Sequence, residues 1–267
     1  MTLSDKHIAF IGSGNITEIL IDNLVGTQAV KPENIIVTDK DKTKRKILRY
    51  KYDVKRNIEN LEAVSRSDII FLNVRPQDLN KLLLELRNAD FTNKLIISVI
   101  GGAPIKKVES LGENLAVVRA LPNPPSQYGH GIIGLCFNDN VSDDQRNITK
   151  ELFSNMGEYI VLKEELMNAK TSLSAPAPVY MFIDAMIEAG VSQGFDRINA
   201  EKIVYRTITG ALEILKQEDD ISYIIKQSCT PGGISEEIVR ILNKNNFRET
   251  INEAVSSGTH RAKSLGG

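Results

Sequence analysis

The chain has 267 residues, which suits one large domain or two ordinary ones, and its 42% hydrophobic and 25% charged residues are typical of a soluble globular protein. Its formal net charge of −1 and the lack of an apolar run of spanning length exclude nucleic acid and membranes as expected partners. The two cysteines, Cys136 and Cys229, predict reduced thiols in a cytoplasmic protein, and the three histidines have no Cys or His at metal-ligand spacing, so no metal is expected.

The first element predicted in chain order is a short strand that ends in a glycine turn. Residues 7–11 form an apolar run that leads directly into Gly12-Ser13-Gly14-Asn15, after which apolar residues recur at helical spacing. In such a unit the first glycine permits the tight turn, and the second lets the backbone approach a pyrophosphate at the helix N-terminus. The third glycine position of the GxGxxG fingerprint is Thr17, but the flanking strand and helix still predict a dinucleotide site. The candidate cofactor-binding residues are Gly12, Ser13, Gly14, Asn15 and Ile16.

The second predicted strand, residues 34–38, ends at an acidic residue. Asp39 stands where a carboxylate usually accepts hydrogen bonds from the adenosine ribose of NAD, although a helix N-cap or a surface position would also explain it. Basic residues follow that could hold the 2′-phosphate of NADP instead: Lys40, Lys42, Lys44 and Arg45. The sequence therefore predicts NAD(P)H as the cofactor, with Asp39 and Lys40 as candidate ligands, and leaves the choice between NADH and NADPH open.

Five further strands follow, separated by helical patterns. They are predicted at residues 67–74, 95–100, 116–120, 131–137 and 160–162. Buried runs that alternate with helices indicate an α/β fold, in which a parallel, doubly wound sheet of the Rossmann type carries helices on both faces.

The loops after three of these strands are rich in proline and glycine. Ligands of such sheets bind in the crevice outside the carboxyl ends of the strands. The breaks after Val74, Ile100 and Leu121 are therefore expected on the same side as Gly12, although ordinary strand exits have the same composition. The candidates for lining the nicotinamide end of the crevice are Val74, Arg75, Pro76 and Asn123.

Strand patterns stop near Lys163, where we expect a domain boundary. Residues 1–163 are predicted to form the dinucleotide-binding domain, and residues 164–267 an all-helical domain for substrate binding and dimerisation. The first two long helices of the second domain are apolar around much of their circumference, with Asn199 as a candidate N-cap. Such helices need a partner beyond one small bundle, so we expect a homodimer built through them, unless they cross the middle of their own domain.

A proline- and glycine-rich loop, residues 228–235, lies between two helical patterns of the second domain. Pro231 and the glycines break the preceding helix, so backbone N–H groups and two hydroxyls are delivered to the start of the next helix. Such a loop can bind an anion such as a carboxylate, or it can be an ordinary turn between helices. The candidate substrate-binding residues are Thr230, Gly232, Gly233 and Ser235.

Several motifs, in the right order along nearly the whole chain, resemble those of the pyrroline-5-carboxylate reductase family. Residues 10–15 match its dinucleotide turn, and the other segments are 74–76 (resembling V-K-P), 119–125 (R-x-M-P-N-T-P), 173–180 (L-S-G-S-G-P-A-Y), 230–235 (S-P-G-G-x-T) and 246–248 (G-F-R). The resemblance implies reduction of 1-pyrroline-5-carboxylate to L-proline, a step of proline biosynthesis, by hydride transfer from NADH or NADPH. It also implies an intertwined helical homodimer, which in this family often assembles into a larger ring of dimers.

The resemblance further implies that the loop of residues 230–235 holds the substrate carboxylate through hydroxyls and backbone N–H groups. Thr230 and Ser235 are then the candidate catalytic residues, with one of the two hydroxyls close to the imine nitrogen. The ring nitrogen can be protonated before the hydride arrives, so a strong general acid is not essential. This agrees with the lack of a convincing His or Asp/Glu acid–base pair in the sequence.

The chain departs from the family pattern at three places near this site. Residues 174–179 read Ser-Ala-Pro-Ala-Pro-Val in place of S-G-S-G-P-A, Pro124 replaces the threonine of P-N-T-P, and Arg206 replaces the glutamine of A-Q-T. Pro176 has no backbone N–H to donate. Two alternatives therefore stay open: a reductase of a different small carboxylated imine or keto acid, and a non-catalytic NAD(P)-binding regulatory protein.

Overall fold

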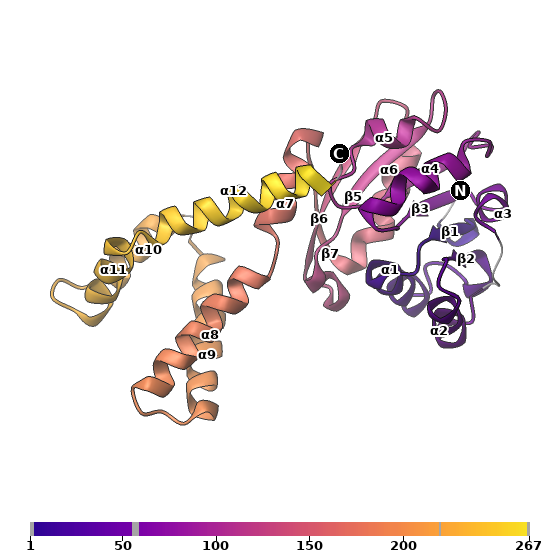
Figure 1. Cartoon of the computed structure of the whole chain (residues 1–267). Helices are drawn as coiled ribbons and strands as arrows, with labels where there is room; N and C mark the ends of the chain where they lie inside the picture. The colour runs from indigo at the N-terminus through magenta and orange to yellow at the C-terminus, as the bar shows by residue number, and fades with distance from the viewer. Residues whose placement is uncertain (1–2, 55–58, 219, 266–267) are drawn as a thin grey trace. The chain divides into compact units, whose positions relative to one another are not determined.

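The computed structural model describes residues 3–54, 59–218 and 220–265, and its contacts divide the chain into two compact units (Figure 1). The first unit consists of Met1–Ala175 and Val255–Gly267, and the second of Pro176–Ala254. The change from strands to helices falls at Lys163, as the sequence pattern indicates. The boundary between the two compact units lies later, after Ala175, because the first helix after Lys163 still buries Met167 against the sheet.

Seven strands form one sheet in the order β2-β1-β3-β4-β5-β6-β7 (Figure 1). They are β1 (Ile8–Ile11), β2 (Ile35–Thr38), β3 (Ile69–Leu72), β4 (Leu95–Ser98), β5 (Ala116–Leu121), β6 (Gly131–Phe137) and β7 (Gly157–Val161). Strands β1 to β5 pair in parallel, so their carboxyl ends share one edge of the sheet. This arrangement confirms the predicted Rossmann-type domain.

The pairing of β6 corrects the prediction of a fully parallel sheet. β6 runs antiparallel to β5, and β7 pairs in parallel with β6. The physical reason is the connection between β5 and β6, residues 122–130, which contains only a 3-10 turn at Pro124–Tyr128. A parallel connection needs a crossover of a dozen or more residues, so this shorter segment can only reverse the chain.

Helices cover both faces of the sheet because alternate strand residues face opposite sides. Ile8 and Phe10 belong to one buried cluster, and Ala9 and Ile11 to the other. The first cluster packs under α1 (Asn15–Gly26), α2 (Lys42–Tyr52) and α6 (Asp143–Phe153). The second packs under α3 (Asn60–Ser65), α4 (Leu79–Leu86), α5 (Ile105–Glu109) and α7 (Glu164–Leu173).

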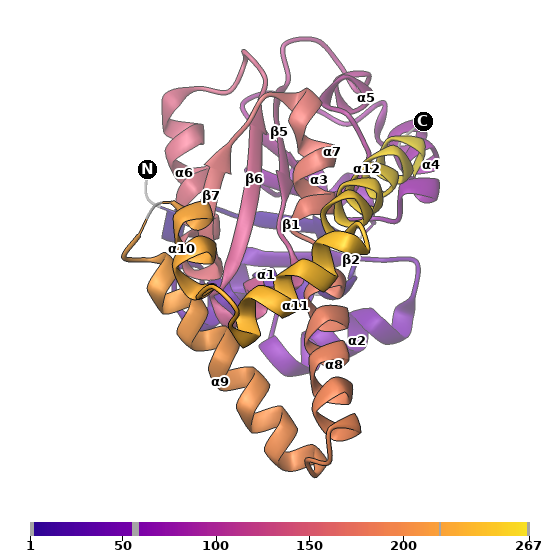
Figure 2. The same ribbon diagram turned by 90° about the vertical axis from the view of Figure 1, so that its left-hand side faces the viewer.

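The second unit is helical. Its elements are α8 (Ala177–Ser192), α9 (Arg197–Leu215), α10 (Ile221–Ser228), α11 (Ile234–Lys244) and the start of α12 (Phe247–Leu265), whose later residues belong to the first unit. Figures 1 and 2 show α8 and α9 side by side, and a small cluster of Ile187, Ala200 and Val204 is buried between them. The N-cap of α9 is Asp196 rather than the predicted Asn199, because the Asp196 carboxylate accepts the Asn199 N–H at 2.9 Å.

Two findings bear on partners and metals. In the part of the chain that the structure describes, no helix is long and apolar enough to cross a membrane. Among the same residues, no group of three or more His, Cys, Asp or Glu side chains is arranged to hold a metal ion. Both cysteines, Cys136 and Cys229, are free thiols.

Candidate active site

The glycine turn after β1 is held by close contacts with β3. Gly12 has φ +109°, and a Cβ at this position would lie 2.1 Å from the Asn73 carbonyl oxygen, so only glycine fits. Thr17, at the third glycine position, is fully buried; its Oγ1 donates to the Gly12 carbonyl at 2.6 Å and accepts from Asn73 Nδ2 at 2.5 Å. Thr17 and Asn73 thus bind the turn to the end of β3, and the departure from GxGxxG is compensated.

Asp39 holds the other side of this turn. Its Oδ2 accepts the Ser13 N–H and the Ser13 hydroxyl, both at 2.7 Å, and its Oδ1 accepts the Asp41 N–H at 2.8 Å. Burial acts to raise the pKa of Asp39, but the hydrogen bonds from Asp41 and Ser13 outweigh it, so the pKa lies below its ordinary value. Three of roughly four acceptor positions are thereby used within the protein. The N-cap alternative for Asp39 is wrong, because Asp41 is the N-cap of α2.

The Ser13 backbone N–H has an acceptor within the protein, because it donates to Asp39. The donors that the turn offers instead are those of the first turn of α1, which begins at Asn15, because an α-helix leaves its first N–H groups without intrahelical acceptors. A Cβ at Gly14 would meet nothing within 4 Å, so the space beside this helix start is open.

A cleft of about 310 Å³ lies at the carboxyl ends of β1, β2 and β3. Of the predicted cofactor residues, it is lined by Gly12, Gly14, Asp39, Lys40, Val74 and Arg75. Ser13, Asn15, Ile16, Pro76 and Asn123 do not line it. Residues that the sequence analysis did not assign to the site also contribute, among them Asn60, Asn73, Asp78, Lys81 and Glu85. A polar side chain directly after a buried strand, as at Asn73, was the available signal.

The charges in this cleft are mixed. Lys40 Nζ pairs with the Asp78 carboxylate at 2.8 and 2.9 Å, and Lys44, Arg75 and Lys81 add further positive charge around it. A dinucleotide carries negative phosphates, so these cations suit it. The open space at Gly14, the helix start and the cations together fit the NAD(P)H expected from the sequence.

Asn123 lies elsewhere and has a connecting role. Its Nδ2 donates to the Ser174 carbonyl at 3.0 Å, and its Oδ1 accepts the Ile132 N–H at 2.8 Å. The side-chain amide therefore joins the loop after β5 to the start of β6 and to the end of α7. These bonds give a structural reason for an asparagine at this position that does not involve the nicotinamide.

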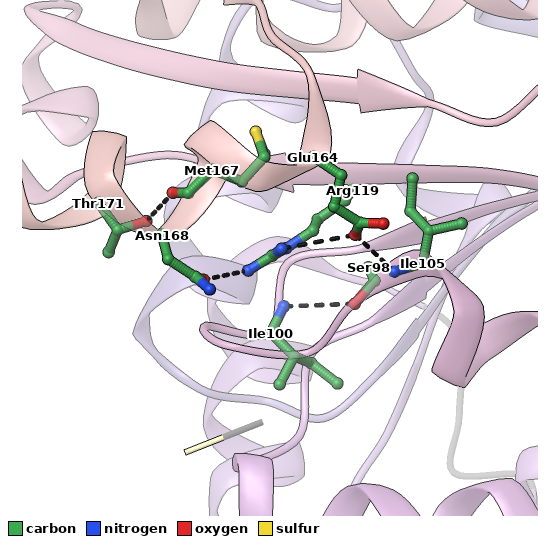
Figure 3. Close-up of polar contacts among 8 residues, drawn as sticks. All are labelled: Ser98, Ile100, Ile105, Arg119, Glu164, Met167, Asn168 and Thr171. Atoms are coloured by element: carbon green, nitrogen blue, oxygen red, sulfur yellow. Dashed lines mark hydrogen bonds and ion pairs between the residues drawn. The ribbon is translucent and has the colours of Figure 1, made fainter. Parts of the chain in front are cut away.

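A buried arginine fastens α7 to the sheet next to this loop (Figure 3). The Arg119 side chain is only 2% exposed; Nη2 donates to Asn168 Oδ1 at 2.6 Å, and Nη1 lies 3.5 Å from Glu164 Oε1. Glu164 also accepts the Ile105 N–H at 2.6 Å, at the start of α5. Burial holds the pKa of Arg119 below its ordinary value, and the charge of Glu164 acts in the opposite direction.

Lys170 adds a second contact between α7 and β5. Its Nζ donates to the Leu121 carbonyl at 2.5 Å, at the carboxyl end of β5. Burial lowers the pKa of Lys170 to about 8. No sequence pattern singles out Lys170, since a lysine in an amphipathic helix ordinarily faces solvent.

The proline- and glycine-rich loop of the second unit joins α10 to α11. Gly232 has φ +71°, which favours glycine, and its N–H donates to Glu236 Oε2 at 2.7 Å. The Gly233 N–H donates to the Thr230 carbonyl at 2.8 Å, and a Cβ at Gly233 would lie 2.3 Å from Thr230 Oγ1. Thr230, Gly232 and Gly233 therefore form one tight turn, and Ser235 follows in the first turn of α11, with Thr230 and Ser235 both exposed.

Together, the strand–glycine turn–helix unit and the cleft at the carboxyl ends of β1 to β3 define the class as an NAD(P)-dependent oxidoreductase. The family model described as NADP oxidoreductase, coenzyme F420-dependent, matches residues 7–102. The model described as pyrroline-5-carboxylate reductase dimerisation matches residues 164–265.

The most informative relatives match the chain along its whole length. The pyrroline-5-carboxylate reductase of Synechocystis is 32% identical over 97% of this chain and 98% of its own, and that of Aquifex aeolicus is 32% identical over 97% of each. The crystal structure of the Plasmodium falciparum pyrroline carboxylate reductase with NADP bound has a TM-score of 0.85 at 28% identity and covers 99% of this chain and all of its own. The chain belongs to the pyrroline-5-carboxylate reductase family.

Proposed function

We propose that the protein reduces 1-pyrroline-5-carboxylate to L-proline by hydride transfer from NAD(P)H. The observation that carries this proposal is the coverage, since relatives named for this reaction match 97% of the chain and include both candidate ligand sites. The cofactor supplies the hydride when it is bound. The protein has to hold the cofactor, orient the imine and provide a hydrogen-bonding group near the ring nitrogen.

In this proposal, the cofactor binds along the edge formed by the carboxyl ends of β1, β2 and β3. The first turn of α1, at Asn15 and Ile16, meets the pyrophosphate, and Gly14 leaves the space for it. Asp39 holds the turn through Ser13 and keeps one acceptor position for the adenosine ribose, while Lys40 and Lys44 face a 2′-phosphate. Val74 and Arg75, which follow β3 and line the cleft, are assigned to the nicotinamide end, with Pro76 directly after them.

The substrate carboxylate is assigned to the loop of residues 230–235. The hydroxyls of Thr230 and Ser235 are exposed, and the backbone of Gly232 and Gly233 forms the start of α11, where the helix dipole favours an anion. One of the two hydroxyls then lies near the imine nitrogen. The protonated imine needs no further strong acid from the protein, and a hydroxyl that orients it is sufficient.

We also propose that the chain functions as a homodimer through α8 and α9. Met181 on α8 is 74% exposed and Ile198 on α9 is 78% exposed, and the second unit buries few hydrophobic residues of its own. Exposed apolar helices of this kind are covered in the functional state of most proteins. Free Cys136 and Cys229 support the cytoplasm as the location.

The test is an assay of NAD(P)H oxidation with 1-pyrroline-5-carboxylate, applied to Thr230→Ala and Ser235→Ala. Each hydrogen bond lost to a charged carboxylate costs about 1.5–3 kcal/mol, so kcat/KM should fall roughly ten- to a hundredfold. Ser228→Ala is the matched control, because its hydroxyl donates to the Ile224 carbonyl within α10 at 2.9 Å and is expected to leave kcat/KM unchanged.

Two outcomes contradict the proposal in different ways. Full catalytic efficiency in both variants would show that the substrate carboxylate does not bind to this loop. A wild-type protein that oxidises NAD(P)H only with other imines or keto acids, or with none, would replace the proposed reaction by one of the alternatives that the sequence leaves open.

A further inference from the structure

The two glycine N–H groups assigned to the substrate carboxylate both have protein acceptors in this structure. The Gly233 N–H closes the turn on the Thr230 carbonyl, and the Gly232 N–H donates to a side-chain carboxylate, that of Glu236, at 2.7 Å. The second contact has the same chemistry as the one proposed for the substrate: a carboxylate oxygen that accepts a backbone N–H at the start of α11.

Glu236 is held in this place by weak forces. It lies in the first turn of α11, where the helix dipole favours negative charge, and its side chain is exposed to solvent. A single exposed hydrogen bond of this type is easily exchanged for one to water or to another ligand. The Glu236 carboxylate can therefore leave the Gly232 N–H when a competing carboxylate arrives.

The neighbouring glutamate shows that this contact is specific to Glu236. Glu237 is in the same helical turn and carries the same charge, but its two oxygens accept from Arg240 at 2.6 and 2.7 Å. Its backbone N–H donates to the Gly233 carbonyl at 3.3 Å, but its carboxylate is engaged by Arg240, and this hydrogen bond holds the pKa of Glu237 below the ordinary value. The two residues thus carry the same charge in the same helical turn and differ in the hydrogen-bond partner of their carboxylates.

We propose that Glu236 is an internal competitor of the substrate, so that its carboxylate occupies the Gly232 N–H in the free enzyme and must be displaced when the substrate carboxylate binds. This inference rests on the proposed function of the loop. Glu236 then sets the substrate KM: it raises the concentration of imino acid at which the enzyme is half saturated, while the hydride-transfer step is left to the other groups.

The experiment compares Glu236→Ala and Glu236→Gln with Glu237→Gln. We expect the KM for 1-pyrroline-5-carboxylate to fall about three- to tenfold in Glu236→Ala, and less in Glu236→Gln, whose amide oxygen still accepts a hydrogen bond. The inhibition constant of proline, which carries the same carboxylate, should fall by a similar factor. Glu237→Gln removes one negative charge from the same turn and should leave both constants within twofold of the wild type, so a purely electrostatic effect is separated from displacement.

The outcomes decide between the inference and the function on which it rests. An unchanged or raised KM in Glu236→Ala, with Thr230→Ala and Ser235→Ala impaired, would show that Glu236 only supports the turn and would overturn the inference alone. An equal fall in KM in Glu236→Ala and Glu237→Gln would also overturn it. If Thr230→Ala and Ser235→Ala have no effect, the loop is not the carboxylate site and both proposals fail. Thermal melts of each variant show whether the helix is intact.

Discussion

The two units hold their candidate ligand groups in opposite ways. In the first unit, the glycine turn is fixed from both sides by buried contacts, with Thr17 and Asn73 on one side and Asp39 on the other. In the second unit, the loop of residues 230–235 is mainly exposed, and its glycine N–H groups bond to its own helix and to its own carbonyl. The candidate cofactor turn is therefore preformed in a single chain, whereas in the candidate substrate loop the glycine N–H groups already have acceptors of their own.

The hydrophobic cores differ in the same sense. The sheet has a large buried cluster on each face, so the first unit buries its hydrophobic side chains within itself. Among its described residues, the second unit buries Ile187, Ala200 and Val204 in a small cluster and leaves large apolar side chains exposed along α8 and α9. A unit with so small a core gains little stability from its own packing, and this is the physical ground for the proposal that a second copy covers these helices.

The largest effect is expected from a substitution in the glycine turn of the first unit. In Gly12→Ala, the new Cβ would lie 2.1 Å from the Asn73 carbonyl oxygen at a φ of +109°, so the turn has to move. We expect cofactor affinity to fall by about 100-fold or more, since a loss of about 3 kcal/mol corresponds to a factor above 100. Titration of the variant with NADPH and NADH, followed by fluorescence, measures this. Gly26→Ala at the end of α1 meets nothing within 4 Å and should bind normally. Wild-type affinity in Gly12→Ala would contradict a rigid turn.

The second prediction tests whether the exposed apolar face of α8 forms the proposed dimer interface. Met181→Asp places a charge on the exposed face of α8, and an unpaired charge buried in an interface costs several kcal/mol. We therefore expect sedimentation to show dissociation at concentrations where the wild type is dimeric. Leu84→Asp changes a similarly exposed leucine on α4 of the first unit, 67% exposed, and should leave the oligomer intact. Equal association of both variants and the wild type would remove α8 from the interface.

The smallest effect concerns Lys170 and the pH dependence of folding. Burial lowers its pKa from the ordinary 10.5 to about 8, so between these two values the unfolded chain binds a proton that the folded chain has released. The stability of the wild type relative to Lys170→Met should therefore rise with pH, by about 1–2 kcal/mol between pH 7 and pH 10 once solvent screening is allowed for. Urea unfolding at both values measures the difference, and Lys163→Met, on the exposed N-cap of α7, is the control. A difference in unfolding free energy between wild type and Lys170→Met that does not change with pH would show that folding does not lower the pKa of Lys170.

The sequence predicts the elements that follow from local patterns. Six strands were expected at buried apolar runs, whereas the last, predicted at residues 160–162, lies at Gly157–Val161 and is mostly exposed. The glycine turn, the loops at the carboxyl edge and the helical second unit were expected from composition and spacing. The reversal at β6 was missed because the apolar run of residues 131–137 reads the same in either direction. Only the length of the connection before it carries the information.

The sequence located both turns, but it did not show which donor meets which acceptor within them. Ser13 and Gly232 are in the expected turns, but their N–H groups bond to Asp39 and Glu236, a result that depends on backbone dihedrals and side-chain reach. The same holds for Asn123, whose two bonds join segments that are distant in sequence. A sequence names the residues that can form such bonds, and only the folded chain decides among them.

The reversed pair of strands decides where the chain leaves its first unit. Because β6 and β7 run opposite to β1–β5, β7 ends at the edge remote from the glycine turn, and α7 then runs back alongside β5 in the same direction. Its contacts follow in step, first Arg119 with Asn168 and then Asn123 with Ser174. The exit point at Ser174 is thus returned to the edge that carries Gly12. Had β6 and β7 been parallel to the other strands, the same helix would have ended at the opposite edge of the sheet. The nine-residue connection 122–130 therefore decides at which edge of the sheet α7 ends.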